Sequence, residues 1–379
     1  MLYCPPWSAA TRFSKHHLAA YLAERGARVL YVEAPLTPLG FRHPKAFATE
    51  FRRAMRPPRQ VRERLWVRRH FLPIAYHAAN RLTSLRAANQ LGQRLLGPVI
   101  TRDMRALGQR RPILIAGLPH AADLPASVPR RALVYHCADD YANARGFPKT
   151  LPQLEADLCR QSDLVITTSE TLCQTRRQFN PHTYWVPNGV DFEHFSRRAE
   201  PAAELHGVAR PIVGFVGGLS EWVDLELIAS LARQRPAWSF AMVGPFGSVP
   251  NPLLASPNVR LLGPRDYAQL PAYLAAMDVA LIPFKHNPVT FHADPIKAYE
   301  YLAAGVPVVA TDLPALRRLA DVVRLARDPT EFLEEIEAAL AEGRDQHAAE
   351  RQAEAKRHSW KSRFAEIERL IGVHATCGS

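Results

Sequence analysis

The sequence lacks the features that would place it in a membrane or export it. Its 379 residues contain no run of about 18 uncharged apolar residues, and the amino-terminal segment has no apolar stretch followed by a small-residue cleavage site. We therefore expect neither a membrane-spanning helix nor a secretory signal. The chain also has no low-complexity tract, and no internal repeat beyond a general similarity of two α/β halves.

Cysteine is scarce and scattered. The five cysteines are Cys4, Cys137, Cys159, Cys173 and Cys377. They form no C-x-x-C pair, and no histidines stand at zinc-ligand spacing. This pattern predicts reduced thiols in a cytoplasmic protein and no bound metal.

What the sequence does have is apolar content and positive charge. Hydrophobic residues make up 47% of the chain, enough for the cores of two domains of ordinary size. The 48 Lys and Arg against 36 Asp and Glu give a net charge of +12. Such an excess favours polyanionic partners, which include nucleic acids, nucleotides and anionic lipids.

Short β-branched runs alternate with helical patterns, which is typical of βαβ units. In the first half the predicted strands are 29–33, 65–68, 113–116, 132–137, 164–168 and 184–186, after a helix over 14–25. In the second half they are 212–216, 240–243, 259–262, 279–283, 306–310 and 322–325. These runs are nearly continuous Val, Ile, Leu and Ala, as expected for parallel strands covered on both faces. The fold class is therefore α/β, with two doubly wound sheets.

The polar stretch from Ser196 to Arg210 precedes a new apolar strand and marks the linker. We expect a first domain over 1–198, a second over 199–345, and a helical segment over 346–379. In that last segment Trp360, Phe364 and Ile367 form an apolar stripe that another element must cover.

The segment from His286 to Thr311 is the most informative. A polar loop, His292–Pro295, precedes a helix over 296–304, which ends at Gly305 before a buried strand. Ligands of open α/β sheets lie beyond the carboxyl ends of strands, where a helix amino terminus presents N–H groups to phosphate. The loop, which contains Asp294, is therefore a candidate anion-binding site.

Two charged residues follow in that helix. Lys297 lies in its first turn, where a cation is unfavourable to the helix dipole unless an anion compensates it. Glu300 lies one turn later, so that a helix aiming Lys297 at phosphates can aim Glu300 at hydroxyl groups. A plain surface pair of Lys297 and Glu300 is the alternative.

The segment PIKAYEYLAAGVPVVAT resembles the nucleotide-sugar-binding segment of GT-B glycosyltransferases, particularly glycosyltransferase family 4 (group 1) and related bacterial polysaccharide-assembly enzymes. Further resemblance covers SDLVITTSETL, VPNGVDFEHF, residues 212–245 and residues 259–284, in matching order. It implies two Rossmann-like domains facing a cleft, the first for the acceptor and the second for the donor, with the carboxyl-terminal helix returning to the first. It also implies that Glu300 binds the donor.

One position departs from the family pattern. The family motif has two glutamates separated by seven residues, and the earlier position falls on His292. Because histidine cannot act as a carboxylate, the resemblance leaves the stereochemical outcome open. His292 stays in the predicted donor site with Asp294, Lys297 and Glu300.

Three more residues are predicted to bind the donor. Gly217 and Gly218 follow the first strand of the second domain, where backbone N–H groups can approach a diphosphate closely. A plain strand-to-helix turn is the alternative. Arg265, in the loop after strand 259–262, is predicted to face the nucleobase or a phosphate, or else to be a solvated loop residue.

The predicted acceptor side is the stretch ALVYHCADDY. His136, Asp139 and Asp140 stand at and just past the carboxyl end of a buried strand. A carboxylate or imidazole there could take the proton of an acceptor hydroxyl, and Asp139 is the first choice. The alternatives are a helix-capping aspartate and a core histidine. We expect no metal or other cofactor, because Lys, Arg and helix dipoles can hold the leaving diphosphate.

Residues 42–69 are strongly basic, with Phe47, Phe51 and Met55 at helical spacing between arginines. This pattern suits an anionic bilayer surface, and a basic solvated face around core residues is the alternative. A second apolar stretch, 71–79, follows.

The sequence therefore predicts a glycosyltransferase, moving a hexosyl group from a nucleotide-diphosphate sugar to a lipid-linked or glycan acceptor in surface polysaccharide synthesis. We expect it at the inner face of the cell membrane, without nucleic-acid partners. A nucleotide-sugar 2-epimerase with the same fold and a basic nucleic-acid-binding protein are the alternatives. The latter is disfavoured because no binding module is recognisable.

Overall fold

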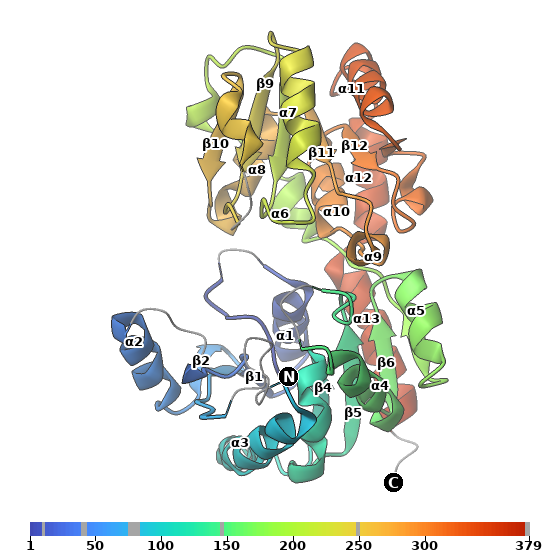
Figure 1. The fold of residues 1–379 in the computed structure, drawn as a ribbon. Helices are drawn as coiled ribbons and strands as arrows, with labels where there is room; N and C mark the ends of the chain where they lie inside the picture. Colours follow the sequence, from blue (N-terminus) through green and yellow to red (C-terminus); the bar gives the residue numbers. More distant parts are fainter. Residues whose placement is uncertain (10–11, 39–43, 75–83, 145–147, 248–250, 376–379) are drawn as a thin grey trace. The chain divides into compact units, whose positions relative to one another are not determined.

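The computed structural model describes residues 1–9, 12–38, 44–74, 84–144, 148–247 and 251–375 (Figure 1). The chain forms two compact units. Unit 1 contains Met1–Ala9, Phe13–Val186 and the chain from Phe364 onward, and unit 2 contains Pro187–Arg363 with Arg12.

The division between the units lies at 186/187 and 363/364, whereas the sequence predicted 198/199 and 345/346. The difference has a local cause. The backbone N–H of Val190 donates to His358, and the N–H of Trp360 donates to Val190. The two connecting segments are therefore hydrogen-bonded to each other within unit 2, ahead of the polar stretch that suggested the linker.

Unit 1 holds most of the first half of the chain. Its strands are β1 (Val29–Val32), β2 (Arg59–Arg62), β3 (Leu65–Arg68), β4 (Ile113–Ala116), β5 (Ala132–Cys137), β6 (Leu164–Thr167) and β7 (Thr183–Trp185). Its helices are α1 (Ser14–Glu24), α2 (Pro44–Ala54), α3 (Arg86–Ala106), α4 (Leu151–Gln161) and α5 (Glu170–Arg177), with short 3-10 helices η2 (Pro119–Asp123) and η3 (Pro125–Ser127).

Two small sheets of unit 1 are joined by the first residues of the chain. One sheet has the parallel order β4-β5-β6-β7, and the other has the order β1-β3-β2, with β2 antiparallel. Leu2 forms a parallel bridge to Ala116, the last residue of β4, and Cys4 forms one to Glu33, just after β1. The segment Met1–Cys4 therefore lies between β1 and β4. The strands β3 and β2 follow beyond β1, and β5, β6 and β7 follow beyond β4.

Unit 2 has a single parallel sheet. Its strands are β8 (Ile212–Val216), β9 (Ser239–Val243), β10 (Val259–Gly263), β11 (Val279–Ile282), β12 (Val308–Thr311) and β13 (Arg324–Ala326). Its helices are α6 (Phe192–Ser196), α7 (Leu225–Gln234), α8 (Leu270–Ala276), α9 (Pro288–Phe291), α10 (Ile296–Ala303), α11 (Pro329–Glu342) and α12 (Ala348–Arg357). Short 3-10 helices are η4 (Ala203–Leu205), η5 (Pro252–Ala255), η6 (Tyr267–Gln269) and η7 (Arg317–Leu319).

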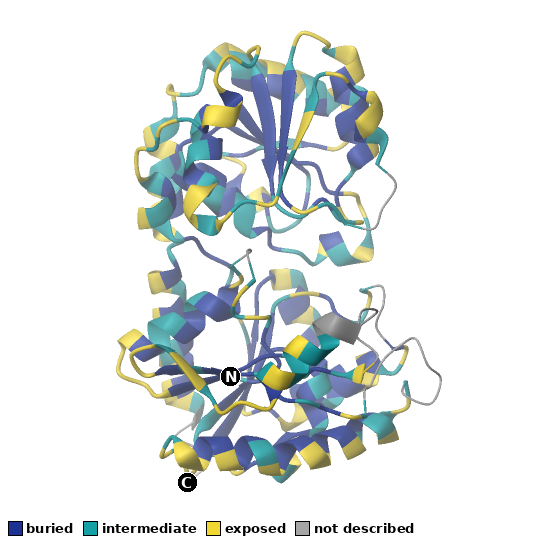
Figure 2. Ribbon diagram, turned by 90° about the vertical axis from the view of Figure 1, so that its left-hand side faces the viewer, coloured by how far each residue is buried: buried dark blue, intermediate teal, exposed yellow. Residues whose placement is uncertain are grey.

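The sheet of unit 2 has the order β10-β9-β8-β11-β12-β13. Counted within the unit, this is the order 3-2-1-4-5-6 of the dinucleotide-binding fold, whose switch point lies between its first and fourth strands. Here that point lies between β8 and β11, which pair directly. The strands β8, β9, β11 and β12 are buried along their whole length, as Figure 2 shows in dark blue, and this confirms the predicted doubly wound architecture.

The final helix, α13 (Trp360–Ala375), begins in unit 2 and continues in unit 1. Within unit 1 the ring of Tyr21 packs 5.6 Å from that of Phe364, and its hydroxyl donates to Glu368 over 3.0 Å. Phe364 and Ile367 are buried, so the apolar stripe predicted for this helix is covered.

Some elements differ from the prediction. The hairpin strand β2 and the 21-residue helix α3 were not predicted, and the helical segment predicted over 346–379 is divided into α12 and α13. Among the described residues no helix is long and apolar enough to cross a membrane. Four of the five cysteines are free and buried, and Cys377 lies outside the described residues.

In the basic segment 42–69, Phe47 and Phe51 lie on helix α2, as their helical spacing suggested, and Met55 follows its end. Phe47 and Phe51 pack on each other and on Phe71, with the ring centroids of Phe51 and Phe71 4.9 Å apart. The two rings are therefore part of a half-buried aromatic cluster, and Met55 is 64% exposed, so contact of this helix with a bilayer stays a prediction. Residues 42–43 and 75–79 of the two predicted stretches lie outside the described residues.

Candidate functional site

Helix α10 is held at the switch point of unit 2. The hydroxyl of Tyr301 accepts a hydrogen bond from the backbone N–H of Val216 over 2.8 Å and donates to the carbonyl of Val216 over 3.1 Å. Val216 is the last residue of β8. Just past the carboxyl end of α10, Gly305 has φ +70°, a conformation that lets the chain turn sharply toward β12. The helix is thus fixed against the carboxyl end of β8.

Lys297, in the first turn of α10, reaches the same strand end. Its Nζ lies 5.3 Å from the ring centroid of Phe215 in β8 and 4.9 Å from that of Phe284 after β11. The two rings provide a cation–π environment and remove the ammonium from bulk water. Burial lowers the pKa of Lys297, and the negative charge of Glu300 opposes that shift.

Gly217 provides the space that Lys297 occupies. A Cβ at position 217 would lie 3.0 Å from Cε and 3.4 Å from Nζ of Lys297, and φ is +151°, in the region that favours glycine. Gly244, with φ +146°, passes so close that a Cβ would lie 1.9 Å from the carbonyl oxygen of Gly217. The structure therefore brings the predicted residues Gly217 and Lys297 together.

Gly218 is less constrained than its neighbour. A Cβ there would meet only Ser220 Oγ, at the ordinary distance of 3.5 Å. Its backbone N–H has no hydrogen-bond partner among the residues that the structure describes, whereas that of Gly217 donates to Val243. This N–H and the Lys297 ammonium are two donors at one strand end, which is what a diphosphate requires.

Glu300 lies one turn from Lys297 on the same helix. Within the described ranges no ion pair of 4.0 Å or less joins them, so the carboxylate is not neutralised by direct contact. Burial raises the pKa of Glu300, Lys297 lowers it, and the nearby Asp191 raises it further. Glu300 is therefore a half-buried carboxyl group with oxygen atoms available to accept bonds from hydroxyl groups.

Asp294 does not fit its predicted role as a donor ligand. One carboxylate oxygen accepts from the backbone N–H of Asn188 over 2.7 Å, and the other accepts from Tyr299 over 2.9 Å and Arg318 over 2.8 Å. The side chain is fully buried. Both oxygens are thus engaged inside unit 2, and Asp294 instead fixes the loop before α10 to the connecting segment at Asn188.

Arg265 is also engaged within the protein. Its guanidinium donates to both carboxylate oxygens of Glu204 over 2.8 Å and to the hydroxyl of Tyr273 over 2.5 Å. Both bonds to Glu204 come from Nη2 and the bond to Tyr273 comes from Nε, so the guanidinium edge that would bind a phosphate is occupied. The predicted donor contact is therefore replaced by an internal ion pair at the carboxyl end of β10.

His292 ends helix α9, and its ring packs edge-on against Phe291 with centroids 5.2 Å apart. It stands two residues before Asp294 and is half-buried. Its assignment to the donor site stays a prediction.

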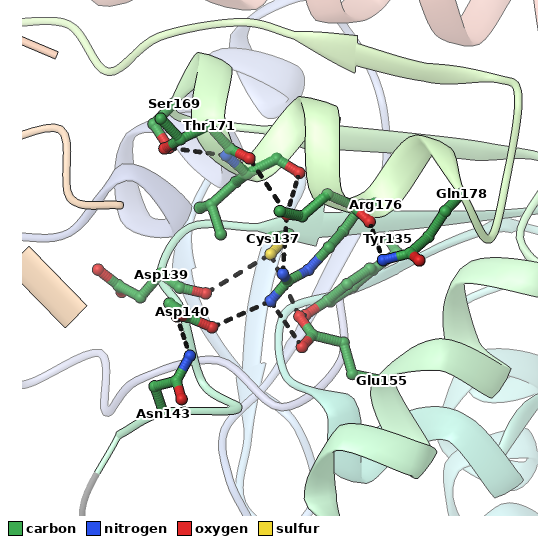
Figure 3. A network of polar contacts seen from close by, with 12 residues as sticks. Tyr135, Cys137, Asp139, Asp140, Asn143, Glu155, Ser169, Thr171, Arg176 and Gln178 are labelled. Carbon is green, nitrogen blue, oxygen red and sulfur yellow. Dashed lines mark hydrogen bonds and ion pairs between the residues drawn. The ribbon is translucent and has the colours of Figure 1, made fainter. Parts of the chain in front are cut away.

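On the acceptor side, the structure separates the two aspartates after β5. Asp139 is exposed, and Figure 3 shows its carboxylate pointing away from the polar network that its neighbour joins. Desolvation by the surrounding protein nevertheless raises the pKa of Asp139 to about 6. Lys15 opposes this shift, and Asp140 adds to it. A carboxylate with a pKa near neutrality can act as a general base, and the role of Asp139 as that base stays a prediction.

Asp140 and His136 belong to the interior instead. Asp140 is 1% exposed and accepts from Arg176 over 3.2 Å and from Asn143 over 2.6 Å (Figure 3). Arg176 also donates to Glu155, so an internal network holds Asp140. His136 lies within a wholly buried strand at 2% exposure, and burial, assisted by Lys15, lowers its pKa to about 3. Neither can be the predicted base, because neither can reach a substrate.

The sequence is similar to a known protein family and to a relative's sequence. Residues 210–342 match the family described as "Glycosyl transferases group 1". The putative teichuronic acid biosynthesis glycosyltransferase TuaH of Bacillus subtilis (strain 168) is 31% identical over 242 residues, covering 59% of this chain and 60% of that protein. The match thus spans about three fifths of the relative's own length.

Solved structures show the same fold at low identity. Sucrose-phosphate synthase of Thermosynechococcus elongatus has a TM-score of 0.72 at 16% identity, with 96% of this chain and 93% of that chain covered. Anabaena Alr3699/HepE in complex with UDP-glucose has a TM-score of 0.69 at 17% identity, with 98% of both chains covered. These likenesses show that the chain has the GT-B fold, and its match to the group 1 glycosyl transferases lies within unit 2.

Proposed function

We propose that the protein is a glycosyltransferase that moves a sugar from a nucleotide-diphosphate sugar to a lipid-linked or glycan acceptor in surface polysaccharide synthesis. The observation that carries the proposal is the position of Lys297, whose ammonium lies beside Gly217 at the switch point of the unit 2 sheet. Nucleotides bind at this point in doubly wound sheets. The matched group 1 family and the teichuronic acid relative support sugar transfer over epimerisation.

In the proposed reaction an acceptor hydroxyl oxygen forms a bond to the anomeric carbon while the bond from that carbon to the diphosphate breaks. Lys297 and the N–H of Gly218 stabilise the charge that develops on the leaving diphosphate. Glu300 accepts hydrogen bonds from hydroxyl groups of the donor, and Asp139 takes the proton of the acceptor hydroxyl. These groups supply the required charges, so we propose that no metal is needed.

A membrane role rests on the basic segment of unit 1. The exposed arginines of α2, β2 and the turns around them are Arg52, Arg56, Arg59, Arg62 and Arg64, and Met55 stands among them. Opposite charge favours contact with anionic lipid by about 1 kcal/mol for each basic residue near the surface. We propose that this face holds the protein at the inner surface of the cell membrane, where a lipid-linked acceptor is accessible.

The test is a transfer assay with the full chain. UDP-, GDP- and ADP-sugars are each incubated with a membrane lipid extract as acceptor source, and labelled sugar in the lipid or glycan fraction is measured together with nucleoside diphosphate release. We expect one nucleotide series to give acceptor-dependent product. Interconversion of donor sugars without any acceptor would refute transfer and favour an epimerase. Pelleting with phosphatidylglycerol vesicles, but not phosphatidylcholine vesicles, tests the membrane face separately.

A further inference from the structure

A lysine without a partner is buried in unit 1. Lys15, in the first turn of α1, is 5% exposed. Its stem lies over Gly117, the residue after β4, where a Cβ would be 2.6 Å from Lys15 Cε and 3.0 Å from the carbonyl oxygen of Tyr3. Glycine at position 117 therefore leaves room for the lysine side chain.

No counter-charge touches this ammonium. Among the residues that the structure describes, Lys15 makes no side-chain hydrogen bond and no ion pair of 4.0 Å or less. A buried charge without a partner is costly, and such groups are normally paired. Burial lowers the pKa of Lys15, and Cys4, Asp139 and Cys137 oppose that shift from beyond contact distance.

Lys15 lies near the switch point of unit 1, where doubly wound sheets bind their ligands. The segment Met1–Cys4 leads into α1 and lies between β1 and β4, where the chain begins to build in both directions. This is the switch point of unit 1, and ligands of doubly wound sheets bind beyond the strand ends at such points. In unit 2 the equivalent point has the same pairing of a lysine with a glycine, at Lys297 and Gly217.

The amino end of α1 adds further donors. This helix has 11 residues, and its N-cap residue, Phe13, offers no side-chain cap. Within the described part of the chain, the backbone N–H groups of Ser14 and Lys15 have no hydrogen-bond partner, whereas that of His16 donates to Phe13. Free N–H groups and the helix dipole favour an anion at this end.

We propose that Lys15 and the first turn of α1 bind an anionic group of the acceptor, a carboxylate or a phosphate, close to the hydroxyl that Asp139 deprotonates. The acceptor is therefore an acidic glycan or a phosphate-bearing lipid rather than a neutral sugar. This inference rests on the proposed function, because it assigns the site to the acceptor. Asp139 does not serve as the counter-ion, because its exposed carboxylate lies beyond ion-pair distance of Lys15.

The experiment measures anion binding to the full chain by calorimetry, with saturating nucleoside diphosphate present so that the donor site is occupied. The probes are methyl β-D-glucuronide, methyl phosphate and, as the neutral control, methyl β-D-glucoside. We expect one of the two anions to bind at least tenfold more tightly than the glucoside, and which one binds distinguishes a carboxylate from a phosphate.

Lys15→Met should weaken that binding at least tenfold, and Lys149→Met, at an exposed lysine of the same unit, should not. Lys15→Met is expected to fold, because removing an unpaired buried charge leaves no partner behind. Lys15→Gln is a second variant, and thermal melting checks both. Nucleoside diphosphate affinity should be unchanged in Lys15→Met and reduced in Lys297→Ala.

Equal anion binding by the parent chain and Lys15→Met, or no anion binding by the parent chain, would overturn the proposal. So would a loss of nucleotide affinity in Lys15→Met as large as in Lys297→Ala, since the anion would then be the donor diphosphate. Intact anion binding with no nucleotide binding would instead contradict the proposed function and leave the anion site standing.

Discussion

The hydroxyl of Tyr301 makes two hydrogen bonds to one residue, accepting from the N–H of Val216 and donating to its carbonyl. Tyr301 is in α10 and Val216 is the last residue of β8, and both are fully buried or nearly so. The backbone N–H and carbonyl at the end of β8 are thus both hydrogen-bonded to a side chain of the helix that carries Lys297 and Glu300. Helix position and strand end are coupled through one oxygen atom.

Tyr301→Phe should therefore reduce nucleotide affinity, although Tyr301 is not itself a proposed ligand of the donor. The substitution leaves a buried N–H and a buried carbonyl of Val216 without a partner, at a cost of about 1 to 3 kcal/mol. We expect urea unfolding to show that loss of stability, and calorimetry to show reduced nucleoside diphosphate affinity. Tyr21→Phe removes a hydroxyl that donates to Glu368 in unit 1, and it should leave nucleotide affinity unchanged. Unchanged stability in Tyr301→Phe would contradict the proposed coupling.

Gly217→Ala tests the close approach at the strand end. Its φ of +151° is costly for alanine, by about 1 to 3 kcal/mol, and the new methyl group would meet Lys297 Cε at 3.0 Å. We expect lower stability together with weaker nucleotide binding, because Lys297 must shift. Gly218→Ala is the matched neighbour, since its Cβ has ordinary contacts, and it should keep the parent melting temperature. Equal melting temperatures for both variants would argue against the strained conformation.

Lys297→Ala removes the proposed ligand of the diphosphate. A hydrogen bond to a charged group contributes about 1.5 to 3 kcal/mol, so affinity for the nucleoside diphosphate should fall roughly 10- to 100-fold. Affinity for the corresponding nucleoside, which lacks phosphate, should not change. Lys285→Ala, at an exposed lysine three residues after β11, serves as the charge-matched control. A variant that binds the diphosphate as well as the parent chain does would end the assignment.

Much of the fold could be predicted because its signals are local. The strand β8 and the helix α10 each have a continuous apolar or periodic pattern, and Gly305 marks the end of the helix. The hairpin strand β2 was missed because its sequence, RQVR, has exposed arginines and no apolar run. Helix α3 has Leu96, Ile100 and Met104 at helical spacing, a signal that could have identified it.

Site residues were harder to predict, because the same residue type at a strand end can bind a ligand or another part of the protein. Asp294 was predicted to bind the donor and Asp140 was a candidate base, yet each accepts from an arginine distant in sequence, Arg318 and Arg176 respectively. Only the three-dimensional structure shows those partners. Lys15 was missed for the converse reason, since a lysine near a helix start is usually exposed.

The adjacent aspartates after β5 should respond in opposite ways to substitution. Asp139→Asn removes the proposed base, so the transfer rate should fall about 100- to 10,000-fold with little change in stability. Asp140→Asn breaks a buried pair with Arg176 and should destabilise unit 1 by about 2 kcal/mol or more.

Because the pKa of Asp139 is raised to about 6, the parent rate should decline as pH falls through that value. If the rate at saturating substrate does not change with pH between about 5 and 7, Asp139 is excluded as the base.

His136 should make the stability of unit 1 depend on pH. Burial, assisted by Lys15, lowers its pKa from 6.5 to about 3. Between these values the unfolded chain binds one proton more than the folded chain does, so the free energy of unfolding falls as the pH is lowered. The slope contributed by this residue is about 1.4 kcal/mol per pH unit. His136→Leu should remove that contribution from urea unfolding measured at several pH values across this window, and His206→Leu, at an exposed histidine, is the control for loss of an imidazole. If His136→Leu keeps the parent slope, the buried histidine is not the neutral core residue that the structure shows.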